Sequence, residues 1–208
     1  MNGSMKVAFA ATKGGAGKTT TLLHCGVASG SFLIDCDPQG SAAQWWQSRE
    51  AALPALVTSS AEKLPHALGM ASTPYVLVDT PPQVGDEIRR IVDLVDYVVV
   101  VTRPSVLDLR AIASTVEIVR GLKKPACILL NACPSGRASA EASIVGEARR
   151  ALAVYGIGVC PVAITQRAAF SHAITAGQGV TEYEPSGAAA GETKRLWSWL
   201  CRSVPSSR

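Results

Sequence analysis

A glycine-rich segment near the N-terminus combines the residue types and the spacing that bind a phosphate group. The segment reads Thr12-Lys13-Gly14-Gly15-Ala16-Gly17-Lys18-Thr19-Thr20. Its glycines allow backbone N–H groups to converge on phosphate oxygens without clashes from Cβ atoms. In this pattern Lys18 reaches the β- and γ-phosphates of a nucleotide, and the hydroxyl of Thr19 is a ligand for Mg²⁺. We therefore expect residues 14–20 to bind a nucleotide together with Mg²⁺.

The sequence on either side of this segment supplies the elements that a phosphate-binding loop needs. Residues 7–11 form an apolar run typical of a buried strand, and residues 20–28 are compatible with a helix. A strand, a glycine-rich loop and a helix in that order place the start of the helix against the phosphates. A flexible glycine turn without a ligand is the alternative interpretation.

Two carboxylates at the end of a second apolar run could serve the same phosphates. Asp35 ends the run at residues 31–35, and Asp37 lies two residues further along the chain. Their side chains point the same way if the strand persists. A carboxylate beside the γ-phosphate can orient the attacking water of a hydrolysis reaction. The alternative is a turn that ends the strand at Pro38.

Two more polar side chains end apolar runs further along the chain. Asp79 closes the run at residues 75–79, a position from which a carboxylate holds Mg²⁺ through water. Residues 80–85 would then form a loop that senses the γ-phosphate. Asn131 ends the run at residues 126–131 and can pair with adenine through its donor and its acceptor, although an Asn that caps a turn is the alternative.

The apolar runs and the segments between them predict an α/β protein. Runs rich in Val, Ile and Leu, expected as buried parallel strands, are residues 6–11, 31–35, 75–79, 97–102, 126–131 and 158–164. Expected helices are residues 18–28, 41–51 with Ser41 as N-cap, 86–94, 105–121, 139–155, 168–177 and 188–204, and residues 51–56 are expected as a loop. The alternation predicts a doubly wound, mostly parallel sheet flanked by helices, in one domain over residues 1–208 with residues 1–4 set aside as a tag or a disordered start. Ligands of such sheets bind at the carboxyl ends of the strands.

Composition excludes some classes of protein and favours others. No apolar run approaches the roughly 18 residues of a membrane span. The six cysteines form no C-x-x-C pair, which argues against structural zinc and favours buried, reduced thiols. The net charge of +4 is uneven, because residues 103–208 hold 13 Lys and Arg against 7 Asp and Glu. A basic C-terminal half favours a surface that meets polyanions.

The phosphate-binding segment departs from the usual pattern in a way that resembles a known family. Thr12 stands where the first glycine is usual, and Lys13 precedes the double glycine. The spacing K-G-G-x-G-K-T resembles the deviant Walker A motif of the ParA/MinD family of P-loop ATPases. The resemblance implies that Lys13 reaches across a nucleotide-sandwich homodimer to the phosphates of ATP bound by the partner. A solvated loop lysine is the alternative for Lys13.

The same resemblance implies roles for the other candidate residues. D-x-D-P-Q at residues 35–39 resembles the second acidic motif of the family. By that resemblance Asp37 positions or activates the attacking water, so Lys13, Lys18 and Asp37 would be catalytic. Asp35 would support Mg²⁺ through its water shell, beside Thr19 and Asp79, and Asn131 occupies the place where the family contacts adenine.

Residues 161–170 and 181–192 most resemble short plasmid-partition ATPases of the ParF type. This resemblance implies a cytoplasmic, nucleoid-associated ATPase whose ATP-bound dimer binds DNA without sequence preference. A ParB-like centromere-binding protein would stimulate slow hydrolysis, and plasmid or chromosome DNA would be segregated. Arg167, Lys194 and Arg195 are the implied DNA contacts, and an ordinary solvated basic face is the alternative.

Three other functions remain open at this point. A MinD-like ATPase that cycles on a membrane would use residues 194–202 as a basic amphipathic helix, although no membrane partner is expected here. A ligase similar to dethiobiotin synthetase would use Lys13 as a substrate contact. The same DNA-linked cycle could also position a different cargo, such as a chemoreceptor cluster or a flagellum.

Overall fold

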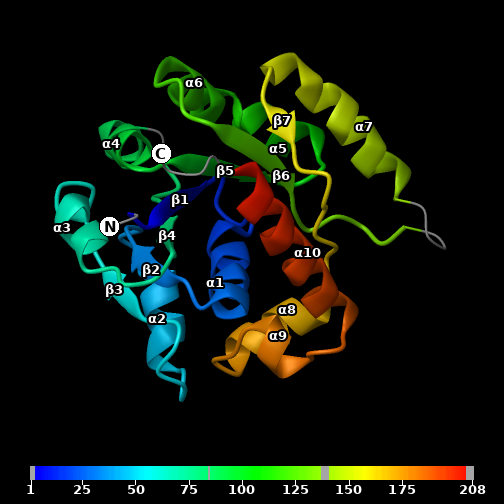
Figure 1. The fold of residues 1–208 in the computed structure, drawn as a ribbon. Helices are drawn as coiled ribbons and strands as arrows, with labels where there is room; N and C mark the ends of the chain where they lie inside the picture. The colour runs from blue at the N-terminus through cyan, green and yellow to red at the C-terminus, as the bar shows by residue number, and fades with distance from the viewer. Residues whose placement is uncertain (1–2, 84, 137–140, 205–208) are drawn as a thin grey trace.

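The computed structural model describes residues 3–83, 85–136 and 141–204, and Figure 1 shows a central sheet with helices on both sides. The sheet has seven strands in the order β3-β2-β4-β1-β5-β6-β7, and every neighbouring pair is parallel. The strands are β1 (Met5–Ala10), β2 (Phe32–Asp35), β3 (Leu56–Thr58), β4 (Tyr75–Asp79), β5 (Tyr97–Thr102), β6 (Ala126–Leu130) and β7 (Gly158–Val159). The predicted doubly wound α/β fold is therefore confirmed.

Helices connect the strands and cover both faces of the sheet (Figure 1). They are α1 (Lys18–Ser29), α2 (Ser41–Gln47), α3 (Leu64–Gly69), α4 (Asp86–Leu94), α5 (Val106–Ala111), α6 (Ala113–Gly121), α7 (Ser143–Leu152), the 3₁₀ turn η1 (Ala153–Tyr155), α8 (Ala168–Thr175), α9 (Val180–Tyr183) and α10 (Ala188–Ser203). None of them, over the residues just given, is both long and apolar enough to cross a bilayer.

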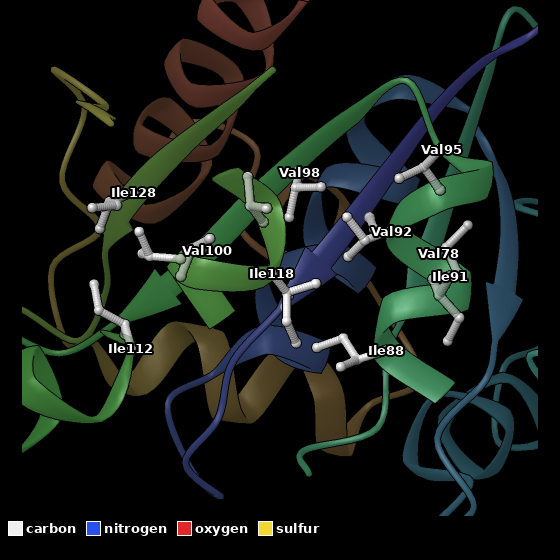
Figure 2. Packing of buried hydrophobic residues seen from close by; sticks show 14 of the residues in the cluster. Val78, Ile88, Ile91, Val92, Val95, Val98, Val100, Ile112, Ile118 and Ile128 are labelled. Carbon is white, nitrogen blue, oxygen red and sulfur yellow. The ribbon is translucent and has the colours of Figure 1, made fainter. Parts of the chain in front are cut away.

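Two hydrophobic clusters hold the helices to the sheet, one on each face. Alternate residues of each strand enter opposite clusters, as in β5, where Val98 and Val100 face one side and Val99 and Val101 the other. The first cluster packs α3, α4, α6 and α7 on the sheet, and Figure 2 shows Ile88, Ile91 and Val92 of α4 within it. The second cluster packs α1, α2 and α10. Burial on both faces explains why the strands read as continuous apolar runs.

The last predicted strand is much shorter than expected. The sequence predicts residues 158–164, whereas β7 ends at Val159. Pro161 has no N–H group to donate to a ladder, and the chain leaves the sheet at this point. It returns at Ile164, whose N–H donates to Leu130 O at 3.0 Å. The run is thus interrupted by proline rather than being one strand.

Strand β3 was missed, because the sequence predicts a loop over residues 51–56. It has three residues, lies at the edge of the sheet and is only partly buried. An edge strand of this length carries too little apolar periodicity to be detected. Helices α3 and α9 are also short and were likewise not predicted.

Three predicted helices differ from the structure at their ends or in the middle. Gly40, not Ser41, occupies the N-cap of α2, and it has a left-handed conformation with φ of 63°. The predicted helix 105–121 is divided into α5 and α6 around Ile112, while Ser105 caps α5 by accepting the N–H of Asp108. The predicted helix 139–155 appears as α7 followed by η1. Its expected start, like residues 1–2 of the set-aside N-terminus and residue 84 of the loop 80–85, lies outside the described residues.

Helix α2 is anchored at its C-terminal end by Arg49. The Arg49 guanidinium pairs with Glu182 of α9, with Nη2 2.6 Å from Oε1, and donates to Gly177 O at 3.0 Å. It also lies over the Trp45 ring, 5.2 Å from the centroid, and its side chain is almost completely buried. These contacts fix the far end of α2 to the segment that packs on α1 and α10.

Candidate nucleotide-binding site

The phosphate-binding loop lies between the carboxyl end of β1 and the first turn of α1. Gly15 and Gly17 adopt left-handed conformations with φ of 77° and 88°. A Cβ on Gly17 would lie 2.0 Å from Nδ2 of Asn131, so only glycine fits there. Thr12, which replaces the usual first glycine, bonds through its hydroxyl to the hydroxyl of Thr115 in α6 at 2.7 Å. The unusual residue thus fastens the start of the loop to the core.

The buried Lys18 and the half-buried Thr19, in the first turn of α1, meet the buried Asp79 at the end of β4. Lys18 Nζ lies 2.6 Å from Asp79 Oδ1, and the Thr19 hydroxyl donates to Asp79 Oδ2 at 2.7 Å. Burial raises the pKa of Asp79 to about 6 even though Lys18 and Thr19 favour its charged form. Lys18, predicted to bind phosphate, therefore lies beside Thr19 and Asp79, predicted to bind the metal. They meet at the carboxyl ends of the strands, where ligands of such sheets bind.

The oxygen atoms of this cluster fit a Mg²⁺ ion. The Thr19 hydroxyl and the Asp79 carboxylate are hard oxygen donors beside the loop that would hold the phosphates. Within the described ranges, no group of three or more His, Cys, Asp or Glu side chains is arranged to hold a metal. Mg²⁺ keeps several waters and takes phosphate oxygens, so two protein oxygens suit it and a larger cage is not needed.

Asp35 and Asp37 face different partners. Asp35 is buried, and its two carboxylate oxygens accept the backbone N–H groups of Asp37 at 3.0 Å and Ala43 at 2.9 Å. Asp37 turns toward the phosphate loop, with Oδ2 3.4 Å from Lys18 Nζ. Asp35 therefore orders the loop that carries Asp37, and a role beside Mg²⁺ stays a prediction for Asp35.

Asn131 directly supports the phosphate loop, a contact that the sequence did not indicate. Its Nδ2 donates to Ala16 O at 2.8 Å, and its own N–H donates to Thr102 O at 2.8 Å. The side chain still has one amide hydrogen and its Oδ1 for another partner. The predicted contact with adenine stays a prediction, whereas the bond to the loop is present.

Two cavities meet at the phosphate loop. One, of about 370 Å³, is lined by Lys13, Lys18, Thr19 and Asp37. The other, of about 240 Å³, extends past Asn131 toward Arg167, Phe170 and Leu196. Gly15, Gly17 and Thr20 line both. This arrangement suits a nucleotide whose phosphates occupy the first cavity and whose nucleoside occupies the second. We therefore call the second one the nucleoside cavity.

Lys13 is paired within its own chain. Its Nζ lies 2.7 Å from Oδ1 of Asp108, whose carboxylate also accepts the hydroxyl of Ser105. Burial alone would raise the pKa of Asp108, but the bonds from Lys13 and Ser105 outweigh it and hold that pKa below its ordinary range. Asp108 is a site residue that the sequence did not indicate, because nothing local links it to the loop.

The three residues predicted to contact DNA line two different cavities. Arg167 lines the nucleoside cavity, and its Nη2 lies 2.8 Å from Oε1 of the buried Glu192. Lys194 and Arg195 line a separate cavity on α10, together with Arg202. Arg167 thus also borders the nucleotide site, and the DNA contacts of Arg167, Lys194 and Arg195 stay predictions.

Fold and site together define a P-loop nucleotide-binding protein with an α/β sheet. Residues 7–180 match the family described as the CobQ/CobB/MinD/ParA nucleotide binding domain. The chain belongs to this family, and the resemblance to ParA and MinD ATPases is confirmed.

Similar proteins include carboxysome and plasmid partition proteins. The chain is 26% identical over 201 residues to "Maintenance of carboxysome distribution protein A" of Halothiobacillus neapolitanus, covering 92% of this chain and 93% of that one. A Cyanothece McdA–ATP complex superposes with a TM-score of 0.78 at 14% identity, covering 97% and 98% of the two chains. A putative plasmid partition protein of Borrelia burgdorferi bound to AMPPNP gives 0.74 at 13% identity, covering 97% and 100%. At these identities the two structures show the fold alone.

Proposed function

We propose that the chain is a ParA-type ATPase that hydrolyses ATP in a homodimer and positions a cargo. The observation that carries the proposal is the cluster of Lys18, Thr19, Asp79 and Asp37 around the phosphate loop. It assembles in one place a phosphate-binding cation, oxygen donors for a metal and a carboxylate that can orient water. The family match and the ATP and AMPPNP complexes of the structural neighbours support ATP as the ligand.

Each residue has a separate task in this proposal. The N–H groups of the loop and the first turn of α1 bind phosphate oxygens, and Lys18 neutralises their charge. Lys18 must then exchange its contact with Asp79 for one with the phosphates. Thr19 and Asp79 would hold Mg²⁺, which neutralises phosphate charge when bound. Asp37 orients a water molecule toward the γ-phosphate.

Lys13 would act on the partner subunit. Its side chain is half exposed and belongs to the same loop, so a second copy placed over the site could receive it. ATP would favour the dimer because its phosphates supply contacts made only across that interface. Release from Asp108 is the step that this role requires.

The face of α10 that carries Lys194, Arg195 and Arg202 is the proposed DNA contact. Such contacts bind phosphates without reading base sequence. On this proposal the protein is cytoplasmic and associates with the nucleoid, and a partner protein stimulates hydrolysis and releases the dimer from DNA.

Two cargoes fit this cycle. Segregation of plasmid or chromosome DNA needs a ParB-like centromere-binding partner, as the resemblance to partition ATPases implies. The relative from Halothiobacillus neapolitanus favours a protein body instead, because its name assigns it to carboxysome distribution. Affinity capture with the ATP-bound protein distinguishes them, since a ParB-like protein with its DNA site supports the first and a body-associated adaptor supports the second.

The membrane-cycling alternative is disfavoured by the packing of α10. Leu196 and Leu200 are buried in the second hydrophobic cluster, and Trp197 packs on Tyr75 with ring centroids 4.9 Å apart. The apolar side of residues 194–202 is therefore already occupied by the core. ATP-dependent co-sedimentation with anionic liposomes would support the alternative, whereas its absence together with DNA binding would support ours.

The decisive experiment compares nucleotide states. ATP with Mg²⁺ should allow binding to unrelated DNA duplexes, ADP should not, and added salt should weaken binding steeply. Equal DNA binding in both states would contradict the switch.

A further inference from the structure

Four Lys and Arg side chains line the two cavities at the phosphate loop, and three of them are paired with carboxylates. Lys13 pairs with Asp108, Lys18 with Asp79 and Arg167 with Glu192. The fourth is Arg103, which lines the nucleoside cavity. Across residues 3–83, 85–136 and 141–204, no hydrogen bond or ion pair engages its guanidinium. Arg103 can therefore meet an anion without first breaking an ion pair.

The backbone directs Arg103 toward the phosphate loop. Arg103 follows the last residue of β5, and β5 pairs directly with β1, the strand that leads into the loop. The buried Pro104 follows, and a residue before proline is restricted to extended conformations. The side chain is exposed, and its Nη2 lies 3.8 Å from the position that a Cβ on Gly15 would take. The guanidinium thus lies over the loop while its backbone is held.

We propose that Arg103 binds the nucleotide in its own subunit through the α-phosphate, an inference that rests on the nucleotide site proposed above. The assignment follows from the cavities: Arg103 lines the one that holds Asn131 and Arg167, not the one that holds Lys13, Lys18 and Asp37. The phosphate nearest the nucleoside is the one within reach from that side. A planar guanidinium can give two parallel N–H bonds to phosphate oxygens, which an ammonium cannot.

This position distinguishes Arg103 from Lys13 and Lys18 in what it should affect. ATP, ADP and AMP all carry the α-phosphate, so all three should lose affinity when Arg103 is removed. Residues at the γ-phosphate should instead affect ATP selectively. Arg103 also contributes to the low pKa of Asp108, so it could act only through Asp108 and Lys13, and the experiment has to separate these two roles.

The experiment is calorimetric titration of the full-length protein with ATP, ADP and AMP in Mg²⁺, using Arg103→Ala, Arg103→Lys and Asp108→Asn. The matched control is Arg110→Ala, an exposed arginine on α5 that lines neither cavity. We expect Arg103→Ala to weaken ATP and ADP alike by about tenfold or more, as for a lost charge-assisted bond. Arg103→Lys should recover part of this, Asp108→Asn should not reproduce the loss of ADP affinity, and Arg110→Ala should leave ADP affinity unchanged.

Three results would overturn the inference. These are unchanged affinities in Arg103→Ala, a loss confined to ATP, and reproduction of the ADP loss by Asp108→Asn. A wild type that binds nucleotides but neither hydrolyses ATP nor binds DNA would defeat the proposed function, yet the Arg103 titrations would still give a clear answer.

Discussion

Lys13 Nζ lies 2.7 Å from Asp108 Oδ1, so the lysine that distinguishes this phosphate loop is bound to its own subunit. Asp108 is nearly buried and is held by Ser105 as well, whereas Lys13 is half exposed. The partner subunit's phosphates would therefore compete with Asp108 for Lys13. On the proposed function, the Lys13–Asp108 pair would have to break before the dimer forms, and this would raise the protein concentration that dimer formation needs.

Neutralising Asp108 should lower that concentration. In Asp108→Asn the ion pair is lost, and a partly exposed pair of this kind contributes about 1 kcal/mol or less. We expect ATP-dependent dimers to form at protein concentrations about threefold to fivefold lower, measured by sedimentation velocity. Glu117→Gln, an exposed residue of α6, controls for the change in net charge. Weaker or unchanged dimerisation in Asp108→Asn would contradict this role of the Lys13–Asp108 pair.

Asp79 should make stability and nucleotide binding depend on pH. Its folded-state pKa of about 6 exceeds the ordinary value of 3.8, so the folded protein binds this proton more tightly than the unfolded chain. Below pH 4 both states are protonated at this group, and the free energy of unfolding should fall as pH rises from about 4 to about 6, by at most about 3 kcal/mol.

Denaturant titrations at several pH values test this directly. Asp79→Asn cannot ionise and should remove that part of the pH dependence, while Asp86→Asn, on the exposed start of α4, should keep it. Affinity for Mg²⁺ with nucleotide should weaken as pH falls through about 6, because a protonated Asp79 is a poor metal ligand. An identical pH profile in Asp79→Asn and wild type would disprove the assignment.

Asp35 and Asp37 should give opposite phenotypes. Asp37→Ala is expected to keep ATP binding and lose turnover, because Asp37 faces Lys18 and its other side-chain bond, from Gln39 N–H, lies in an exposed turn. Asp35→Asn retains only one acceptor for two backbone N–H groups and should lower the free energy of unfolding by about 1–3 kcal/mol. Thermal unfolding and phosphate release measured together separate the two, and retained hydrolysis in Asp37→Ala would remove Asp37 from its role.

Asn131→Ala should weaken nucleotide binding through the loop. The substitution removes the bond to Ala16 O and leaves a space beside Gly17, so affinity for ATP and ADP should both fall by about tenfold. Comparison with GTP tests the predicted contact with adenine: if Asn131 reads the base, the preference for ATP over GTP should also shrink. Unchanged affinity for all three nucleotides would show that the loop does not depend on Asn131.

The basic residues of α10 should control DNA affinity without affecting nucleotide binding. Lys194→Ala with Arg195→Ala should weaken binding to all duplexes equally and reduce the salt dependence, since each lost phosphate contact lowers the slope by about one. Arg167→Ala should instead alter nucleotide affinity, because Arg167 lines the nucleoside cavity. A duplex-binding titration in ATP at several salt concentrations measures both, and loss of DNA binding in Arg167→Ala alone would reverse the assignment.

The parts of this structure that follow from local pattern could be predicted. Strands β4 and β5 have the bounds that their apolar runs indicate, because both faces of the sheet are covered. The meeting of Lys18 with Asp37 and Asp79 follows from the rule that parallel strands present their carboxyl ends at one edge.

Contacts that depend on tertiary approach could not be predicted. Asp108 meets Lys13 and Asn131 meets Ala16 across long separations in sequence, and no spacing marks either pair. Arg103 had no motif to indicate it. The edge strand β3 was missed for a related reason, since its assignment depends on pairing with β2 more than on its own composition.

Arg49 holds the C-terminal end of α2 in place through its contacts with Glu182 and Gly177. The helix is clamped to Glu182 and Gly177 at the end remote from Asp37, so it cannot slide or rotate as a rigid rod when Asp37 moves. Displacement of Asp37 must be absorbed within residues 37–40, where Gly40 already has a left-handed backbone. If Asp37 moves when nucleotide binds, we expect the backbone at Gly40 to change and the contacts of Arg49 with residues 177–182 to stay in place.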